Sequence, residues 1–402
     1  MGRGIAPAGR TLMTRSILLV AAGILAASCA ACAPPSSSPP APTRVAANCT
    51  FNASSVGVLA PGYFPNPGGN TYSIPGQNLQ TGSSLSTQMI NDINAAFTNA
   101  PLAVQNDVCA LSGIFIDTSS CQGGTINPCT PVNNNLPVSW GYRSYNRADP
   151  GFMYVAIPAS LWPTVNTMAI PLSQYEQNAV QYFALNAGNP YWGSSTNPTY
   201  PLPNISSVSY NNRGTSWPTV LAALAHELGH VKFNYTIHKK NHYGEDYDFS
   251  LLHNCNTGST TIDFFNWWTY SGNYKKIFPK GSKGYWRQFG YQDNQNSNQK
   301  IDHSLSPFLS DFKDLTHYAN PNPLLYTLYS DEAEPWASFW GAWSPDEDFV
   351  ETYVLSALLD NMTSLQISIS GYSPYDVIAN TTQNNKPVLY SKIQCVANLP
   401  TI

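Results

Sequence analysis

The fold of this chain is decided by residues 216–231, which read SWPTVLAALAHELGHV. Ser216 is placed to cap a helix, and Pro218 falls in the first turn, where a proline is tolerated. Apolar side chains then recur at helical spacing, namely Val220, Leu221, Leu224, Leu228 and Val231. We therefore predict the strongest helix of the chain here.

This helix carries the motif His226-Glu227-Leu228-Gly229-His230. Because the two histidines are four residues apart, both rings project from one helix face and can occupy two corners of a tetrahedral zinc site. Glu227 is adjacent to the first histidine, so it lies beside the metal, where it can take a proton from a water activated by zinc. The alternative is a helix whose histidines only form hydrogen bonds, which is the weaker interpretation in a chain with only 7 His.

A zinc site needs a third protein ligand. The metzincin pattern is excluded, because it requires Gly and His where this chain has Phe233 and Thr236. His238 and His242 are close in sequence but match no known ligand spacing. The third ligand is therefore expected further along the chain.

The better candidate lies in residues 344–353, which read SPDEDFVETY. A helix is predicted over residues 346–359, and Glu347 and Glu351 lie four residues apart on it, so both carboxylates face the same way. One can bind zinc while the other accepts the ring N–H of a zinc-bound histidine, which fixes the tautomer of that ring. Asp348 is the rival to Glu347 as ligand, and Glu347 is preferred because its partner at the fourth position completes the helix face.

HELGH followed by a Pro-x-Glu-Asp-Phe-x-Glu helix resembles the gluzincin branch of the zincin metallopeptidases, in which two helices supply His, His and Glu. The Glu-x-Phe-x-Glu spacing is similar to that of the lethal-factor-like members. Carried over by position, the resemblance implies that His226, His230 and Glu347 bind zinc. It also implies that Glu227 is the catalytic base and that Glu351 is the hydrogen-bonding partner of a zinc ligand. The resemblance is confined to these two segments.

The same resemblance implies an α+β fold, a zincin-like two-lobed catalytic domain with a small mixed sheet over the HExxH helix. An edge strand of that sheet would align an extended peptide, and residues 152–157 are the candidate. A gluzincin-like site also adds a Tyr or His that hydrogen-bonds the oxyanion. The sequence leaves four candidates open for that role: Tyr326, Tyr329, Tyr353 and His317.

The N-terminal residues indicate export. Residues 17–27 form an uncharged apolar run that suits a signal-peptide core and is too short to span a bilayer. The small residues before Cys29 resemble a bacterial lipoprotein signal, in which the cysteine is lipidated. Cys32 is a weaker candidate, and secretory cleavage near Ala30 is the alternative. We expect a signal peptide at 1–28, an extended Pro/Ser tether at 29–48 and one zincin-like domain at 49–402 with possible lobes 49–232 and 233–402.

Six cysteines remain beyond the tether, and an even number in an exported chain favours three disulfides. Cys121 and Cys129 are typical of a local loop clamp. The pairing of the other four is open: Cys49, Cys109, Cys255 and Cys395. No paired Cys-x-x-Cys spacing supports zinc binding by these cysteines.

Composition excludes several classes of protein. Charged residues make up 10% of the chain, against about 25% in an ordinary globular protein. Aromatic residues reach 12%, which argues against charged disorder. With 19 Lys+Arg against 23 Asp+Glu, the net charge of −4 gives no support for nucleic-acid binding.

Residues 274–287 contain a cluster of basic side chains. We interpret this segment as a solvated loop, and binding of an anionic substrate is the alternative. Further elements are predicted as helices at 84–100 and 174–185 and as strands at 112–117 and 152–157.

These features predict an exported, lipid-anchored zinc metallopeptidase of the bacterial cell envelope that acts on a peptide or protein substrate, and they give no oligomeric state. A zinc amidase acting on envelope peptides is a second enzyme class. A surface-binding or adhesion lipoprotein with a structural or vestigial zinc site is the alternative of a different kind. Glu227 distinguishes them, because a structural site needs no base beside its first ligand.

Overall fold

The computed structural model describes residues 49–53, 56–59, 85–111, 113–118, 121–124, 126, 129–130, 153–163, 169, 205–210, 216–237, 250–265, 322–342 and 345–402. All of them belong to the unit Val45–Ile402. Several predictions of the sequence lie outside these residues and stay predictions: the signal peptide with Cys29 and Cys32, the tether, the helix at 174–185, the basic segment 274–287, and His238, His242 and His317. The division of residues 49–402 into lobes likewise stays a prediction.

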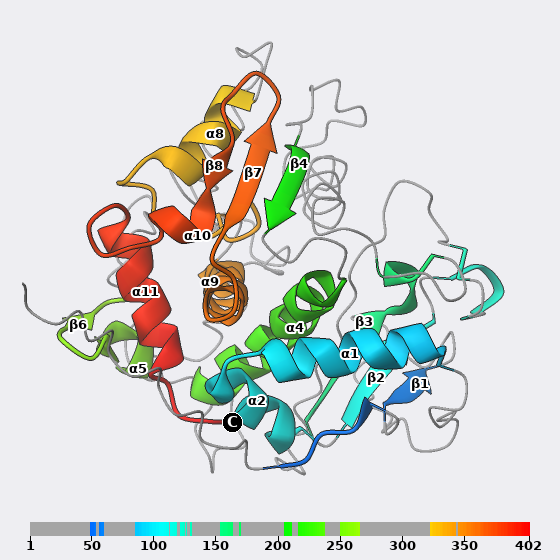
Figure 1. The fold of residues 1–402 in the computed structure, drawn as a ribbon. Coiled ribbons are helices and arrows are strands. Elements are labelled where there is room, and N and C mark those ends of the chain that lie inside the picture. Colours follow the sequence, from blue (N-terminus) through cyan, green and yellow to red (C-terminus); the bar gives the residue numbers. More distant parts are fainter. Residues whose placement is uncertain are drawn as a thin grey trace, which may run out of the picture. The chain divides into compact units, whose positions relative to one another are not determined.

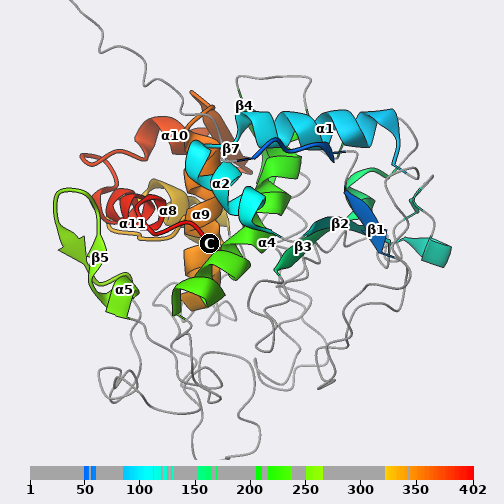
Figure 2. The ribbon, with the colours of Figure 1, turned by 90° about the horizontal axis from the view of Figure 1, so that it is seen from below.

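The predicted central helix is confirmed as α4, which spans Trp217–Ile237. It is buried on every side along most of its length, and only Asn234, Tyr235 and Thr236 are partly exposed. A helix that is apolar all round is stable only when it is enclosed by other elements. Helices α1 and α2 and strand β3 contact α4, and α9 packs beside it (Figures 1 and 2).

A parallel three-stranded sheet lies next to α4. Its strands are β1 (Gly57–Leu59), β2 (Gly113–Asp117) and β3 (Tyr154–Pro158), in the order β1-β2-β3. Helices α1 (Thr87–Asn99) and α2 (Leu102–Ala110) connect β1 to β2, since parallel neighbours need a crossover. The strands predicted at 112–117 and 152–157 and the helix predicted at 84–100 are thus confirmed within a few residues. Short 3-10 turns, η3 (Gln122–Gly124) and η4 (Ala159–Leu161), follow β2 and β3.

A second sheet is antiparallel, with the order β4-β7-β8. Its strands are β4 (Ile205–Tyr210), β7 (Leu365–Ile369) and β8 (Tyr375–Asp376). The chain reverses between β7 and β8 through Gly371, whose φ of 91° suits a residue without a Cβ. A two-stranded antiparallel ribbon pairs β5 (Cys255–Asn256) with β6 (Thr261–Ile262). The remaining helices are α5 (Ser250–His253), α8 (Asn322–Ser330), α9 (Pro345–Leu359), α10 (Val377–Asn380) and α11 (Pro387–Ala397).

The described part of the chain therefore combines helices with small sheets, compatible with the predicted α+β class. The sheet composition differs in detail from the expectation of one mixed sheet. Among the described strands each sheet is purely parallel or purely antiparallel. Where the connections are described, they account for this difference, because helices α1 and α2 lie between the parallel strands β1 and β2, whereas a turn through Gly371 joins the antiparallel strands β7 and β8.

The predicted helix at 346–359 is confirmed as α9, and it lies close against α4 because of one glycine. A Cβ placed on Gly229 would lie 3.2 Å from the Cα of Val350, so a larger side chain would push the two helices apart. Phe349 on α9 packs against Phe233 of α4 and Phe264, with ring centroids 5.2 Å and 5.6 Å apart, respectively. Helix α11 contacts the same α9. The glycine of the HELGH motif thus brings the two predicted ligand-bearing helices together.

Three disulfides are present, as predicted: Cys49–Cys109, Cys121–Cys129 and Cys255–Cys395. The expected loop clamp is one of them. The other two join distant segments. Cys49–Cys109 connects residue 49 to α2, and Cys255–Cys395 connects β5 to α11. Such bonds persist in an oxidising compartment, which agrees with the prediction of export. In the part of the chain that the structure describes, no helix has the length and apolar character needed to cross a membrane.

Candidate metal centre

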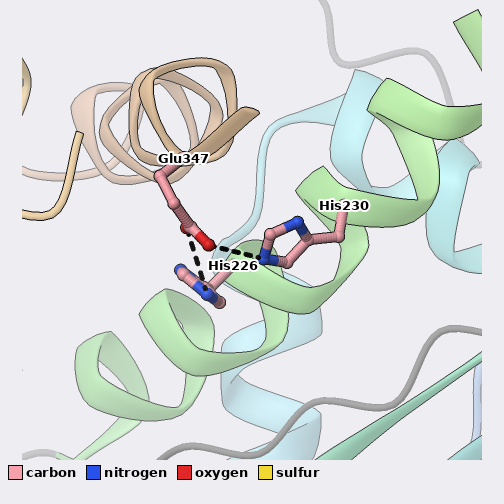
Figure 3. Close-up of side chains that lie close together, drawn as sticks. All are labelled: His226, His230 and Glu347. Atoms are coloured by element: carbon pink, nitrogen blue, oxygen red, sulfur yellow. Dashed lines mark ion pairs between the residues drawn. The ribbon is translucent and has the colours of Figure 1, made fainter. Parts of the chain in front are cut away.

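Three side chains from α4 and α9 converge in the interior (Figure 3). Nε2 of His226 lies 3.8 Å from Oε2 of Glu347, and Nε2 of His230 lies 3.5 Å from Oε1 of the same carboxylate. All three are buried, and one ligand atom from each lies within 4.8 Å of the others. The structure thus brings together the two histidines and the distant glutamate that the sequence singled out.

Local helix geometry explains this convergence. His226 and His230 are one turn apart on α4, and their ring centroids are 4.9 Å apart at 83°. Glu347 lies in the first turn of α9, where the positive end of the helix dipole favours a negative side chain. Gly229 keeps the two helices close enough for the carboxylate to reach both rings.

Glu351 lies on the far side of the His226 ring from Glu347. Its Oε1 is 2.8 Å from Nδ1 of His226, and its Oε2 accepts a 2.6 Å hydrogen bond from Oγ of Ser338. A carboxylate can only accept, so Nδ1 of His226 carries the proton and Nε2 is left to face Glu347. This is the arrangement that the sequence predicted for Glu351, and it leaves the correct ring nitrogen for a metal.

Glu227 is buried next to the same ring. Its Oε1 lies 3.9 Å from Nε2 of His226, so its carboxylate and that of Glu347 approach the same ring atom. It does not belong to the set of three mutually close ligand atoms. The position beside the set, rather than in it, is the one predicted from its place in the motif.

The rival third ligand, Asp348, is excluded by its contacts. Its carboxylate forms a buried ion pair with Lys392 of α11, with Oδ2 2.5 Å from Nζ. Lys392 also donates to the carbonyl of Pro335 and lies over the rings of Phe264 and Trp336. Neighbouring residues on a helix point about 100° apart, so Asp348 faces α11 while Glu347 faces α4.

The structure also narrows the search for an oxyanion donor. The hydroxyl of Tyr353 donates to Oδ2 of Asp107 at 2.8 Å, so it is not available at the centre. Burial, and then the charge of Asp107, raise the pKa of this phenol well above its usual range. Tyr326 stacks on Tyr372 with ring centroids 4.5 Å apart. Tyr329 is buried on α8. His317 remains a prediction, because it lies outside the described residues.

Electrostatics favour a cation between these groups. Burial lowers the pKa of His226, but the hydrogen bond to Glu351 and the charges of Glu347 and Glu227 outweigh burial and raise the pKa to about 9. Without a metal, the ring therefore carries a second proton at neutral pH, in addition to the one on Nδ1. The resulting positive charge balances part of the buried negative charge of three carboxylates. A divalent cation at the same place would balance more of it.

The donor set itself also fits a metal ion. Two imidazoles and one carboxylate form a common three-ligand set for zinc, with a fourth position open. Zinc bonds of about 2.0–2.1 Å put the corners of a tetrahedron about 3.3 Å apart. The distances of 3.5 and 3.8 Å from Glu347 to the two rings approach that separation. Small side-chain movements would close the set around an ion.

Two contacts of the centre were not expected from the sequence. Besides Ser338, the ring of Trp340 lies 4.5 Å from that of His226 at an interplanar angle of 40°. Both residues belong to the turn that precedes α9, and neither stands at a recognisable spacing from the HELGH motif. No pattern in the sequence could have identified them.

Comparison of the chain with protein-family models, with curated proteins and with solved structures found no match, so the interpretation of this centre depends on its own residues and geometry.

Proposed function

We propose that this chain is a zinc-dependent metallopeptidase with a gluzincin-like centre. The observation that supports this best is the convergence of His226, His230 and Glu347, with Oε1 of Glu227 only 3.9 Å from the ring nitrogen that faces the centre. A metal site that serves only stability has no need of a buried carboxylate beside its first ligand. A hydrolytic site needs that carboxylate as a base.

His226, His230 and Glu347 would hold the ion. Zinc supplies Lewis acidity, which polarises a carbonyl and makes water a better nucleophile near neutral pH. The remaining steps belong to the chain. Glu227 takes the proton of the attacking water and then gives it to the leaving nitrogen.

The surroundings of His226 support this assignment. Glu351 holds the ring with its proton on Nδ1, so Nε2 is directed towards Glu347. Glu227 and Glu347 are at most 8% exposed. Interactions of charged groups are stronger in such a water-poor environment than at the surface.

Strand β3 is the element suited to bind substrate in this proposal. Among the described strands it lies at the edge of its sheet, and it contacts α4. An extended peptide adding to the edge with which no described strand pairs would gain main-chain hydrogen bonds and run past the catalytic helix. The proposal thus includes a zincin-like two-lobed arrangement and a peptide or protein substrate. It also includes export with a lipid anchor at Cys29.

Glu227→Gln is the direct test. We expect the variant to keep one zinc ion per chain, measured by elemental analysis, because Glu227 is not a ligand. We expect hydrolysis of a quenched-fluorescent peptide library to fall by about 10²–10⁴-fold, because the base is lost. Glu332→Gln is the matched control, since Glu332 is exposed and lies outside both motifs.

Three outcomes would contradict the proposal. A wild-type protein without stoichiometric metal would exclude zinc chemistry altogether. Metal bound without any peptide hydrolysis would favour the structural site of a surface-binding lipoprotein. Hydrolysis confined to peptidoglycan peptides would favour the envelope amidase instead.

A further inference from the structure

Ser338 connects the turn before α9 to the metal centre. Its hydroxyl donates to Oε2 of Glu351 at 2.6 Å, and the other oxygen of Glu351 lies 2.8 Å from Nδ1 of His226. All three side chains are at most 6% exposed. Ser338 is thus connected through two hydrogen bonds to Nδ1 of His226, the ring whose other nitrogen, Nε2, would bind the ion.

The donor and the acceptor of each hydrogen bond between Gly341, Ser338, Glu351 and His226 follow from the groups involved. The backbone N–H of Gly341 donates to Oγ of Ser338 at 3.2 Å, so this oxygen already accepts a hydrogen bond. A hydroxyl has one proton, and here that proton goes to Glu351. With one carboxylate oxygen engaged by Ser338, Glu351 presents the other to His226 in a fixed orientation.

The same turn packs tightly against Glu351 and His226. A Cβ placed on Gly341 would lie 3.2 Å from the Cβ of Glu351, so the turn lies directly on this part of α9. The ring of Trp340 covers the His226 ring with 4.5 Å between centroids. Glu351 therefore has little room for another rotamer, and the loss of one hydrogen bond is not easily replaced by water.

We propose that Ser338 is a positioning residue of the metal centre, which orients Glu351 and so holds His226 in the tautomer with Nε2 free. This inference rests on the metal centre of the proposed function but not on the identity of the substrate. Partners outside the ligand set of a metal site typically change metal affinity by about 10–100-fold when they are replaced. Because Ser338 acts through Glu351, we expect an effect of about tenfold, near the lower end of that range.

The test is Ser338→Ala, measured by two readouts that do not depend on activity. Zinc affinity, determined by competition with a chromophoric chelator, should fall by about tenfold. In the zinc-loaded protein, the NMR resonance of the Nδ1 proton of His226 should move upfield, because its hydrogen bond to Glu351 weakens. Ser356→Ala is the matched control: this hydroxyl lies on α9, the helix that carries Glu351, and donates to the carbonyl of Tyr353.

A second pair of variants keeps the proposal testable if the alanine variant does not fold. Ser338→Thr and Ser338→Val have nearly the same shape and differ in the hydroxyl. We expect the threonine variant to bind zinc about tenfold more tightly than the valine variant. Equal affinities in this pair, or wild-type affinity with an unshifted ring resonance in Ser338→Ala, would overturn the proposal.

The two proposals fail in different ways. A wild type that binds zinc but cleaves no peptide would contradict the peptidase function and leave the role of Ser338 supported by its affinity data. A wild type that cleaves peptides, together with Ser338→Ala that binds zinc normally, would support the peptidase function and contradict the role of Ser338.

Discussion

At the scale of single residues, His226 is the most constrained side chain of the centre. Glu351 binds one ring nitrogen, Glu347 and Glu227 face the other, and Trp340 covers the ring. The pKa of about 9 means that the metal-free ring is protonated at pH 7, well above the ordinary value of 6.5. A proton and a metal ion therefore compete for the same nitrogen.

We expect zinc binding at pH 7 to release a proton from His226. Below pH 9 the zinc affinity should rise by about tenfold per pH unit, and it should level off above that value. Isothermal titration calorimetry in buffers of different ionisation enthalpy measures the released proton. Glu351→Gln removes a charge that raises the pKa of His226, so zinc binding to this variant should release a smaller fraction of a proton. Zinc binding to Glu332→Gln should release as much as in the wild type. Zinc binding that releases no proton at pH 7 would show that the ring is already neutral.

The same shift predicts how the stability of the metal-free protein depends on pH. The folded-state pKa of His226 lies above its unfolded value, so the stabilisation is complete below pH 6.5 and is lost as the pH rises through about 9. A shift of this size corresponds to roughly 3 kcal/mol. Urea unfolding of the metal-free protein between pH 6 and pH 9 measures it. A wild type that is as stable at pH 9 as at pH 6 would contradict the prediction, whereas His226→Ala, which lacks this group, should not show the loss.

At the scale of elements, the contact between α4 and α9 decides the geometry of the centre. Gly229 is a point of this contact that a side chain would disturb, because a Cβ there would lie 3.2 Å from the main-chain Cα of Val350. Backbone cannot move aside as a flexible side chain can. The spacing of the helices therefore sets the distance between the histidines and Glu347.

Gly229→Ala should destabilise the protein even though alanine is the better helix former. The gain in helix propensity is about 1 kcal/mol, whereas overpacking of a core typically costs about 1–3 kcal/mol. We expect a net loss in urea unfolding and a weaker zinc affinity, because α9 carries Glu347 away from α4. Thr236→Ala is the control on the same helix, at a partly exposed position. Unchanged zinc affinity in Gly229→Ala would show that the helix spacing is not critical.

How much of this could be predicted from the sequence depends on the range of each interaction. The pairs His226/His230 and Glu347/Glu351 were identified because i,i+4 spacing on a helix fixes which side chains share a face. The contacts of Ser338 and Lys392 could not be identified from the sequence, because they join segments that are brought close together only by the whole fold. The pairing of β4 with β7 is of the same kind, with more than 150 residues between the two strands.

Lys392 illustrates this limit best. A lysine on an amphipathic C-terminal helix is expected at the surface, yet this one is fully buried against Asp348. Burial lowers its pKa, while the charge of Asp348 opposes that change. A charge is buried in this way only where a partner compensates it, and the partner was not recognisable from sequence spacing.

At the scale of the whole molecule, the Cys255–Cys395 disulfide joins the β5–β6 ribbon to α11. Helix α11 in turn supplies Lys392, which binds Asp348 next to the candidate ligand Glu347. The bond thus supports α9 from the side opposite α4. The Cys121–Cys129 disulfide closes a short loop after β2, in another part of the sequence.

Replacement of both Cys255 and Cys395 by Ser should lower the free energy of unfolding by about 2–4 kcal/mol. It should also weaken zinc binding, because the support of α9 loosens. The matched control replaces Cys121 and Cys129 by Ser, and we expect that variant to keep its zinc affinity. Urea unfolding and chelator competition measure the two effects. Equal zinc affinity in both double variants would separate the disulfide from the metal centre.

The same bond has a consequence for where the metal centre can form. In a reducing cytosol, Cys255 and Cys395 would stay as thiols, and α11 would lack its covalent tie. The metal centre would then reach its full affinity only after the chain enters an oxidising compartment. The exported peptidase proposed above would therefore be restrained while it is still among the proteins of its own cell.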